Sequence, residues 1–456
     1  MCVRISGWML MNKGRKFFYL FLGWLLLFNV AKAKAHFDNI HTFELGNGLQ
    51  VVVIENHKAP IIKQMVFYRT GSIDEAIGKG GLAHLLEHLM FRGTENISGQ
   101  QFNDIMERNG ALSNAFTSQD VTAYHQLIDV ARLETAMTLE ADRMQNLQIK
   151  DDDFAAERQI VFQERKQRVD NNPAAKFNEA IRKTLWQNHP YARQVTGEDA
   201  EILQLSKQDA IDFYQNYYAP DNAVLVLSGD IDVAIAKDLA QKHYGAVKSH
   251  AGTNKLDLPK LPSKYKASVS MELPDVQLGR MVNLYAAPSF NLDQSKIYAY
   301  EVLAAYLGGD KNSPLYQKIV IQDKKALDVD IAYNPISRSY GVFEIVVIPT
   351  GIQENMDFWL QRAWDYALHK LDAEQLEMTK QKLLSELIYT EDNPAEIADL
   401  VGYMAAVGVD LANLRNYADN IKNVTLEDVI SAASALRNNS PQVSGILYPR
   451  KDDNNE

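Results

Sequence analysis

At 456 residues the chain is longer than one hydrophobic core normally supports, so two or more domains are expected. A hydrophobic content of 46% and a charged content of 23% are typical of a soluble globular protein. The formal net charge of −11 becomes −17 if residues 1–35 are removed, because they hold six basic and no acidic residues. A surface this acidic argues against nucleic acid as a partner.

The N-terminus differs from the rest of the chain. A basic segment, 13–16, precedes an apolar run, 17–28, and small residues follow as far as Ala35. This order predicts a secretory signal peptide over 1–35, cleaved near Ala33 or Ala35, and export to a bacterial periplasm. The alternative is an inner-membrane anchor through the uncleaved apolar run, which is short for a membrane span.

The only cysteine, Cys2, lies in the segment predicted to be removed. The mature chain would then have no disulfide and no thiol chemistry, so any zinc must be held by histidine and carboxylate ligands. Met9 and Met11 are alternative starts, because residues 1–10 add nothing that the signal needs.

Residue patterns predict alternating strands and helices in the first part of the mature chain. An Asn-Gly turn between β-branched stretches is typical of a hairpin, and apolar residues at helical spacing indicate amphipathic helices. We expect a hairpin over 43–54, strands over 64–69 and within 110–124, and helices over 102–108 and 131–148.

Leucines at helical spacing predict a helix between Gly81 and Gly93. His84 and His88 are one turn apart and Glu87 lies between them, so the three side chains share one side of that helix. Two such imidazoles can bind one metal ion, and the carboxylate can reach a water molecule on it; the order HxxEH is the inverzincin pattern. Helical histidines are more often ordinary core or surface residues, so this interpretation depends on a third ligand.

A later helix supplies two candidate acids. Aspartates 151–153 suit a helix start, because they meet the positive end of the helix dipole. Buried carboxylates without partners are costly, so glutamates on the apolar face of this helix should be paired or bound to a metal. Arg165 falls on another face or its edge, where a solvated charge is expected. The residues predicted to form the buried face, at spacings of three and four, are Phe154, Glu157, Ile160, Val161 and Glu164.

An order of helix, proline and strand over 203–232 recurs over 424–447. A repeat about 220 residues long indicates two similar α/β domains in tandem rather than a solenoid. We expect a first domain at 36–247, a linker at 248–266, a second, homologous domain at 267–448 and a disordered tail at 449–456.

Several short sequence motifs occur along the mature chain, most of them between Phe43 and Asp230. They are Asn47-Gly48-Leu49, Gly71-Ser72-x-Asp74-Glu75, Gly81-Leu82-Ala83-His84-Leu85-Leu86-Glu87-His88, Phe91-x-Gly93-Thr94, Asn114-Ala115-x-Thr117 and Asn222-Ala223. The set resembles the pitrilysin family of zinc peptidases, which includes the mitochondrial processing peptidase. The resemblance implies an α+β fold of two tandem α/β-sandwich domains, each an antiparallel-rich sheet with helices on one face, in a clamshell around a peptide chamber.

The resemblance also implies the metal ligands and the reaction. In the family the third zinc ligand is a glutamate about seventy-five residues after the second histidine, and Glu164 lies 76 residues after His88. One Zn²⁺ per chain would be held by His84, His88 and Glu164 with water in the open position, and Glu87 would be the general base. The first domain would then be a zinc metalloendopeptidase acting on short or unfolded peptides, and the second domain would hold no zinc.

The family has a further glutamate seven residues before the third ligand, which matches Glu157. We expect Glu157 to act with Glu87 in catalysis, by orienting a histidine or supporting the water; the alternative is a structural buried acid. By the same resemblance, an edge strand is expected to pair with the substrate backbone, the alternative being an ordinary strand. Its residues are Asn114, Ala115, Phe116 and Thr117.

The second domain departs from the family pattern. Active single-chain members show an Arg after a Gly-Gly pair and a Tyr soon afterwards, both in contact with substrate. Here Pro314 and Val329 stand at the expected positions, and proline offers neither charge nor donor. Some bacterial members are heteromeric, so we expect a homologous partner subunit to supply the missing Arg and Tyr; a homo-oligomer is also open.

Two classes of function follow. The first is the zinc-dependent endopeptidase, and the second is a catalytically silent peptide-binding or structural subunit of the same family. The intact HxxEH pattern together with Glu164 favours the first, because a retired site has no reason to keep four such residues at such spacing.

Overall fold

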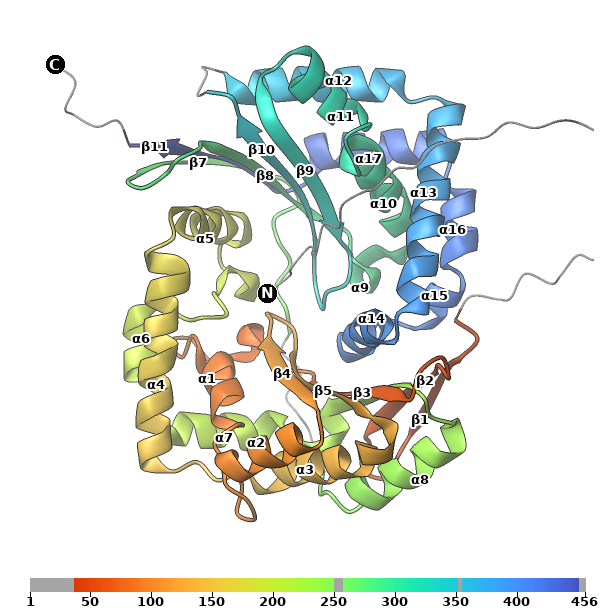
Figure 1. Cartoon of the computed structure of the whole chain (residues 1–456). Coiled ribbons are helices and arrows are strands. Elements are labelled where there is room, and N and C mark those ends of the chain that lie inside the picture. Colours follow the sequence, from red (N-terminus) through yellow and green to blue (C-terminus); the bar gives the residue numbers. More distant parts are fainter. Residues whose placement is uncertain (1–36, 250–256, 352–354, 451–456) are drawn as a thin grey trace, which may run out of the picture. The chain divides into compact units, whose positions relative to one another are not determined.

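The computed structural model describes residues 37–249, 257–351 and 355–450 (Figure 1). Its strands are β1 (Ile40–Glu44), β2 (Gln50–Glu55), β3 (Ile61–Tyr68), β4 (Leu112–Thr117), β5 (Thr122–Asp129), β6 (Ala223–Gly229), β7 (Lys266–Leu273), β8 (Arg280–Ala287), β9 (Ala326–Asn334), β10 (Gly341–Pro349) and β11 (Gln442–Pro449). They form two sheets. Sheet 1 has the order β1-β2-β6-β3-β5-β4, and sheet 2 has the order β7-β11-β8-β10-β9.

The two sheets repeat one topology. In sheet 1 the pair β2 and β6 is parallel, and β6-β3-β5-β4 are antiparallel neighbours. In sheet 2 the pair β7 and β11 is parallel, and β11-β8-β10-β9 are antiparallel neighbours. Each strand of sheet 1 from β2 onward therefore has a counterpart five strands later, which confirms the predicted fold of two homologous α/β units.

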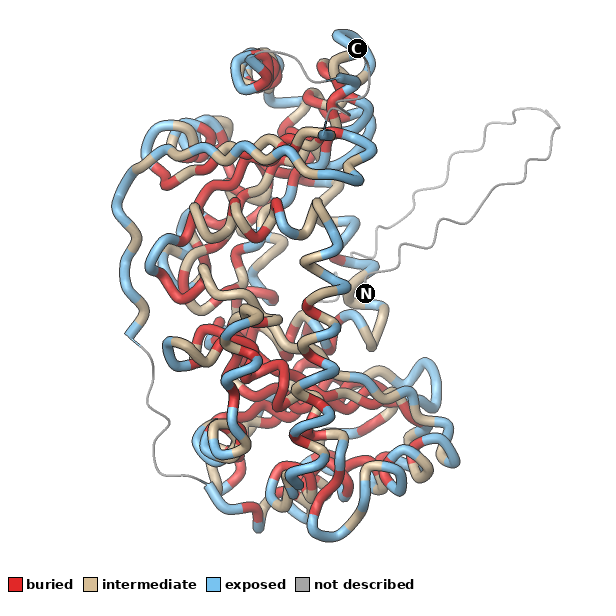
Figure 2. The backbone as a smooth tube through the Cα atoms, turned by 90° about the vertical axis from the view of Figure 1, so that its left-hand side faces the viewer, coloured by how far each residue is buried: buried red, intermediate tan, exposed pale blue. Residues whose placement is uncertain are grey.

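Each sheet carries helices of its own half on one face. On sheet 1, residues of α1, α3, α7 and α8 share a hydrophobic core with β2, β3, β5 and β6, and on sheet 2 α10, α12 and α17 do the same with β8, β9 and β10. Figure 2 shows these buried stretches in red between exposed turns. The helices are α1 (Leu82–Leu89), α2 (Gly99–Arg108), α3 (Leu133–Asn146), α4 (Asp151–Arg165), α5 (Pro173–Trp186), α6 (Asp199–Gln204), α7 (Lys207–Tyr217), α8 (Val233–Tyr244), α9 (Phe290–Asp293), α10 (Ile297–Gly308), α11 (Pro314–Tyr316), α12 (Met356–Lys370), α13 (Ala373–Asp392), α14 (Pro394–Ala406), α15 (Ala412–Arg415), α16 (Tyr417–Asn423) and α17 (Leu426–Asn439).

One helix of each half covers the opposite face of the other half's sheet. Helix α14 packs on β3 and β6 of sheet 1, and α5 packs on β7, β8 and β11 of sheet 2 (Figure 1). The contacts are close: a Cβ on Gly402 of α14 would lie 2.1 Å from Phe67, and one on Gly445 of β11 would lie 2.3 Å from Ile181. The halves thus share two hydrophobic cores, one beneath α14 and one beneath α5. Each sheet also forms a separate core with helices of its own half.

The predicted hairpin, the strands and the helices of the first half are all present. Helix α4 begins at the three aspartates, as predicted, but Ile160 is 40% exposed, so its place on the buried face was wrong. The buried side of α4 is a narrow stripe, and Ile160 lies at its edge. The expectation of a solvated Arg165 was also wrong, because α5 packs nearby and Glu179 pairs with its guanidinium at 2.9 Å.

The domain boundaries remain a prediction. The predicted signal peptide, 1–35, lies outside the described residues, as do 250–256 of the predicted linker and 451–456 of the predicted tail. The first tail residue, Pro449, ends strand β11, and the Arg450 N–H donates to Leu273 O at 3.1 Å. Within the described part of the chain, no helix is long and apolar enough to cross a membrane.

Candidate metal centre

Helix α1 is fixed at its start by backbone conformation and by a buried acid. Gly81 precedes it with a φ of 86°, in the left-handed region that favours glycine, and a Cβ there would lie 3.1 Å from Thr196 O. The Ala83 N–H in the first turn donates to Glu75 Oε1 at 2.9 Å, which satisfies a donor that has no partner within the helix. The loop before α1 therefore fixes the start of the helix that carries His84 and His88.

Three potential ligands converge between α1 and α4. Glu164 Oε2 lies 3.7 Å from His84 Nε2 and 3.9 Å from His88 Nε2, and ligand atoms of the three residues all lie within 4.8 Å of one another. Glu164 Oε2 is buried and accepts no hydrogen bond from any residue that the structure describes, although Nη1 of Arg168 lies 3.3 Å away in an ion pair. Two imidazoles and a carboxylate are the donor set of catalytic zinc sites, and a buried carboxylate oxygen facing both imidazoles fits a bound cation.

The second nitrogen of His88 is held by a carboxylate. His88 Nδ1 lies 2.8 Å from Glu157 Oε2, and the guanidinium of Arg92 binds the other oxygen, Glu157 Oε1. Glu157 is 3% exposed. Burial alone would raise the pKa of Glu157, but the hydrogen bonds from His88 and Arg92 lower it. An ionised Glu157 thus favours a proton on Nδ1 of His88, which leaves Nε2 free to bind a metal.

The two imidazoles differ in their electrostatic surroundings. Burial, with the nearby charges of His88 and Arg168, lowers the pKa of His84 to about 3, so His84 is neutral at pH 7. Burial also acts to lower the pKa of His88, but the hydrogen bond to Glu157 and the surrounding carboxylates raise it. A metal ion would therefore compete with a proton at His88 and not at His84.

Glu87 stands beside the three ligands and is held by the edge strand. The Thr117 hydroxyl, at the end of β4, donates to Glu87 Oε2 at 2.5 Å. Burial raises the pKa of Glu87, and the hydrogen bond from Thr117 opposes that shift. A carboxyl whose pKa lies above its usual range is a stronger base once ionised, which suits proton abstraction.

Strand β4 is the last strand of sheet 1 on the side of α1, so one of its edges is unpaired within the described residues. Asn114 accepts only a local hydrogen bond, from the Ala115 N–H at 2.9 Å. Phe116 packs edge-on against Phe67, with the ring centroids 6.1 Å apart, on the face away from α1. Of the four residues predicted to bind substrate, Thr117 is thus the one that contacts Glu87 directly.

A second group of potential ligands is less suitable. Glu55, His57 and Asp232 also bring ligand atoms within 4.8 Å of one another. However, His57 and Asp232 are exposed, and His57 Nδ1 already lies 2.7 Å from Asp230 Oδ1. Exposed acidic groups of this kind are common without an ion. The less exposed group on α1 and α4 is therefore the candidate metal centre.

The two positions where the family resemblance places an Arg and a Tyr hold a proline and a buried valine. Pro314 is the first residue of the short helix α11, where a proline ring suits helical φ. Val329 is 6% exposed and faces the helix-covered core of sheet 2, so that position does not present a side chain to the open face of β9. The exposed neighbours on either side of it are Asp328 and Asp330.

Sequence reasoning missed several residues around the site. Arg92 lies four residues after His88 and could have been found by helical spacing, although α1 ends before it at Leu89. Arg168 lies four residues after Glu164 and pairs with it at 3.3 Å, so helical spacing could have found it as well. The role of Thr117 in holding Glu87 follows from tertiary packing and has no local signal.

Comparisons with known proteins agree with this geometry. Residues 50–199 match the family model described as insulinase, peptidase family M16, and residues 204–383 match the peptidase M16 inactive domain. The chain is 28% identical over 436 residues to the zinc protease PqqE of Helicobacter pylori, covering 91% of this chain and 94% of that protein.

Two further similarities concern the fold and a part of the chain. A solved structure of a protease from Helicobacter pylori superposes with a TM-score of 0.81 at 27% identity, over 90% of this chain and 99% of that chain. Subunit 1 of the mitochondrial cytochrome b-c1 complex of Bos taurus is 30% identical over 204 residues, which is 45% of this chain and 42% of that protein.

Proposed function

Because the chain belongs to peptidase family M16, we propose that it is a zinc-dependent endopeptidase that hydrolyses peptide bonds in short or unfolded polypeptides. The observation that carries the proposal is the convergence of His84, His88 and Glu164 beside Glu87. The chain's similarity to zinc proteases over nearly its whole length supports the same reaction class.

Zinc bound by His84, His88 and Glu164 would supply a Lewis acid for the scissile carbonyl and lower the pKa of water towards ~7. Glu87 takes the proton from the attacking water and later passes it to the leaving amine. The Thr117 hydroxyl keeps Glu87 Oε2 in place between these two transfers. Glu157 orients His88 through Nδ1 and does not touch the reacting atoms.

The free edge of β4 is the proposed binding site for the substrate backbone. An extended peptide that pairs with Asn114, Ala115, Phe116 and Thr117 would extend sheet 1 by one strand and run past Glu87. Recognition through main-chain hydrogen bonds requires an extended segment and little side-chain specificity. This suits unfolded substrates enclosed between the two halves, as the predicted clamshell would provide.

A homologous partner subunit is part of the proposal. Pro314 replaces a substrate-binding arginine, and Val329 is buried, so this chain lacks contacts that active single-chain members have. The similarity of part of the chain to a subunit of a larger complex supports an oligomer. Residues 1–35 and the acidic mature chain support a periplasmic location, with an inner-membrane anchor as the alternative.

A catalytically silent peptide-binding subunit is the second candidate, because the same departures at Pro314 and Val329 and the same similarity to a complex subunit favour it. The two candidates predict different behaviour of Glu87. In a silent subunit, Glu87 has no proton to transfer, and its replacement changes nothing that the assembly does.

The experiment is hydrolysis of a quenched fluorogenic peptide by the purified mature chain, with zinc, with a chelator and as Glu87→Gln. Chelator-sensitive hydrolysis that Glu87→Gln abolishes supports a self-sufficient enzyme. If the zinc-loaded chain is inactive alone, the homologous subunit is added. Hydrolysis that then appears, and is lost with Glu87→Gln in this chain, supports the heteromeric enzyme. Hydrolysis that does not depend on Glu87, or no hydrolysis with either preparation, refutes the proposed reaction.

A further inference from the structure

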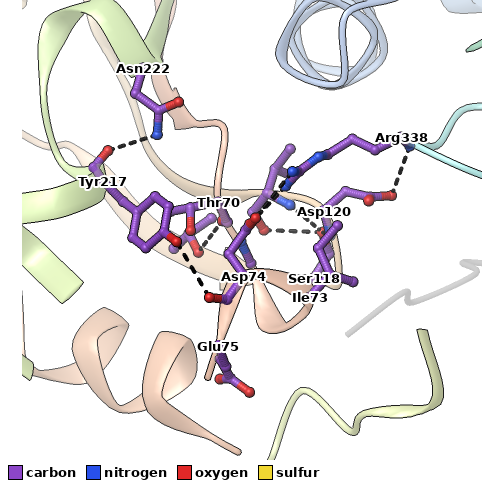
Figure 3. A network of polar contacts seen from close by, with 12 residues as sticks. Thr70, Ile73, Asp74, Glu75, Ser118, Asp120, Tyr217, Asn222 and Arg338 are labelled. Carbon is purple, nitrogen blue, oxygen red and sulfur yellow. Dashed lines mark hydrogen bonds and ion pairs between the residues drawn. The ribbon is translucent and has the colours of Figure 1, made fainter. Parts of the chain in front are cut away.

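Arg338 crosses from one half of the chain to the other. It lies in the loop between β9 and β10 of sheet 2, and its guanidinium binds Asp74 of the first half with two hydrogen bonds, of 2.7 and 3.1 Å (Figure 3). Both side chains are largely buried, with exposed fractions of 17% for Arg338 and 3% for Asp74. Such a buried, two-pronged ion pair is far more directional than an ion pair in solvent.

Asp74 belongs to the loop that starts the metal-site helix. Its carboxylate accepts from the Gly71 N–H at 3.0 Å and so closes the short turn over Ser72–Asp74. The next residue, Glu75, is the one that accepts from Ala83 in the first turn of α1. Two consecutive acids, Asp74 and Glu75, therefore connect Arg338 to the start of α1, the helix that carries His84.

The backbone of the same loop reaches the edge strand. The Arg338 N–H donates to Asp120 Oδ2 at 3.4 Å, and Asp120 lies in the turn between β4 and β5 (Figure 3). Tyr191 donates to Asp120 Oδ1 at 2.8 Å and accepts from the Ser339 N–H at 3.0 Å. This turn follows directly after Thr117, the residue that holds Glu87.

The two anchored segments also contact each other. The N–H groups of Ser72 and Ile73 donate to the carbonyls of Ser118 and Gln119, at 3.2 and 3.1 Å. A Cβ on Gly71 would lie 2.5 Å from those carbonyls, so the approach is as close as backbone allows. The Arg338 loop thus binds both sides of a junction between the start of α1 and the end of β4.

We propose that Arg338 is a positioning residue for the metal centre. From the half of the chain that contributes no metal ligand, it fixes the start of α1 relative to the end of β4, and hence Glu87 relative to Thr117. The inference rests on the proposed function only in taking His84 and His88 as metal ligands.

The test compares Arg338→Met with Arg182→Met in the full mature chain. Arg182 on α5 pairs with Glu344 on β10 at 3.5 Å, so its replacement also removes an ion pair between the two halves; this pair lines one cavity with Asp120 but binds neither Asp120 nor Asp74. The readouts are amide hydrogen exchange over 71–90 and 112–121, zinc retention against a chelator, and melting temperature.

We expect Arg338→Met to exchange faster over both segments and to hold zinc more weakly, each by about tenfold, the middle of the range for residues coupled through packed networks. Arg182→Met should leave both readouts unchanged at a similar melting temperature. Arg338→Lys, which keeps the charge but loses the two-pronged geometry, should restore part of the protection.

Equal exchange in the two methionine variants, or unchanged exchange and zinc retention in Arg338→Met, overturns the proposal. If Arg338→Met does not fold, Asp74→Asn replaces it under the same criteria, because the amide oxygen can still accept from Gly71. A wild-type chain that binds no zinc refutes the proposed function instead, and the exchange readout then still decides whether Arg338 positions α1.

Discussion

Glu157 Oε2 lies 2.8 Å from His88 Nδ1, while Arg92 binds the other oxygen of the same carboxylate. The arginine, the carboxylate and the imidazole form one chain of charge-assisted hydrogen bonds. These hydrogen bonds fix the imidazole ring of His88 so that Nε2 faces Glu164. In the proposed metal centre, Glu157 would therefore act through His88, as hydrogen-bond partners of metal-bound histidines generally do.

Replacing Glu157 by Gln should weaken zinc binding about 10- to 100-fold, the range for such partners, because the ring of His88 loses its anchor and its basicity. Competition with a chelating dye measures this. The matched control is Glu134→Gln, at an exposed acid that pairs with Lys242 on the surface. Equal zinc affinity of Glu157→Gln and wild type would show that Glu157 is only a structural acid.

Thr117→Val should shift the pH dependence of hydrolysis. The hydroxyl stabilises ionised Glu87, against burial, which raises the pKa. Without it the pKa of Glu87 rises further, so the acidic limb of kcat/KM moves to higher pH. The control, Thr117→Ser, keeps the hydroxyl and should keep the profile. A shift to lower pH in the valine variant would contradict the role given to Thr117.

Asp120 should make stability depend on pH. Burial raises its pKa to about 6 from 3.8, although the Tyr191 hydroxyl and the charge of Arg338 oppose the shift; Asp74 adds to it. The folded state then binds the proton more tightly than the unfolded state, so the contribution of Asp120 to stability is present below about pH 4 and lost as pH rises through about 6.

Wild type should thus lose stability relative to Asp120→Asn between pH 4 and 7, by up to about 3 kcal/mol. Urea unfolding of both proteins across this range gives the difference in free energy of unfolding. A difference that is constant with pH, or that grows in favour of wild type, would contradict the prediction.

Gly402→Ala should destabilise the contact of α14 with sheet 1. The new Cβ would lie 2.1 Å from Cε2 of Phe67, a ring that is itself fully buried, so either the helix or the ring must move. Such overpacking costs about 1–3 kcal/mol in the free energy of unfolding. Gly46→Ala, with no atom within 4 Å of its Cβ, is the control and should change stability by less than about 0.5 kcal/mol.

Patterns of short range predicted much of the fold. The hairpin at Asn47-Gly48, helix α1 and the start of α4 at Asp151 each depend on neighbours within a few residues. The burial of Glu157 also followed from helical spacing. The repeat of helix and strand predicted two related sheets, although not which strands pair in parallel.

Other features depend on residues far apart in the chain. The packing of α5 and α14 on the sheet of the opposite half has no local signal, and neither has the pairing of Arg165 with Glu179 of α5. Arg338 and Asp74 are 264 residues apart and meet only because the β9–β10 loop reaches the first half. The alternation of β9 shows why Val329 faces the core, which the family motif alone did not reveal.

The measurement that tests the account most directly is the zinc content and coordination of the purified mature chain, by mass spectrometry and X-ray absorption. We predict one zinc per chain with two imidazole ligands and one carboxylate. Glu164→Ala and His84→Ala should lose it, and Glu87→Gln should keep it. A folded wild-type chain without zinc, or zinc that stays bound when Glu164 and His84 are replaced, would contradict the assignment of this site.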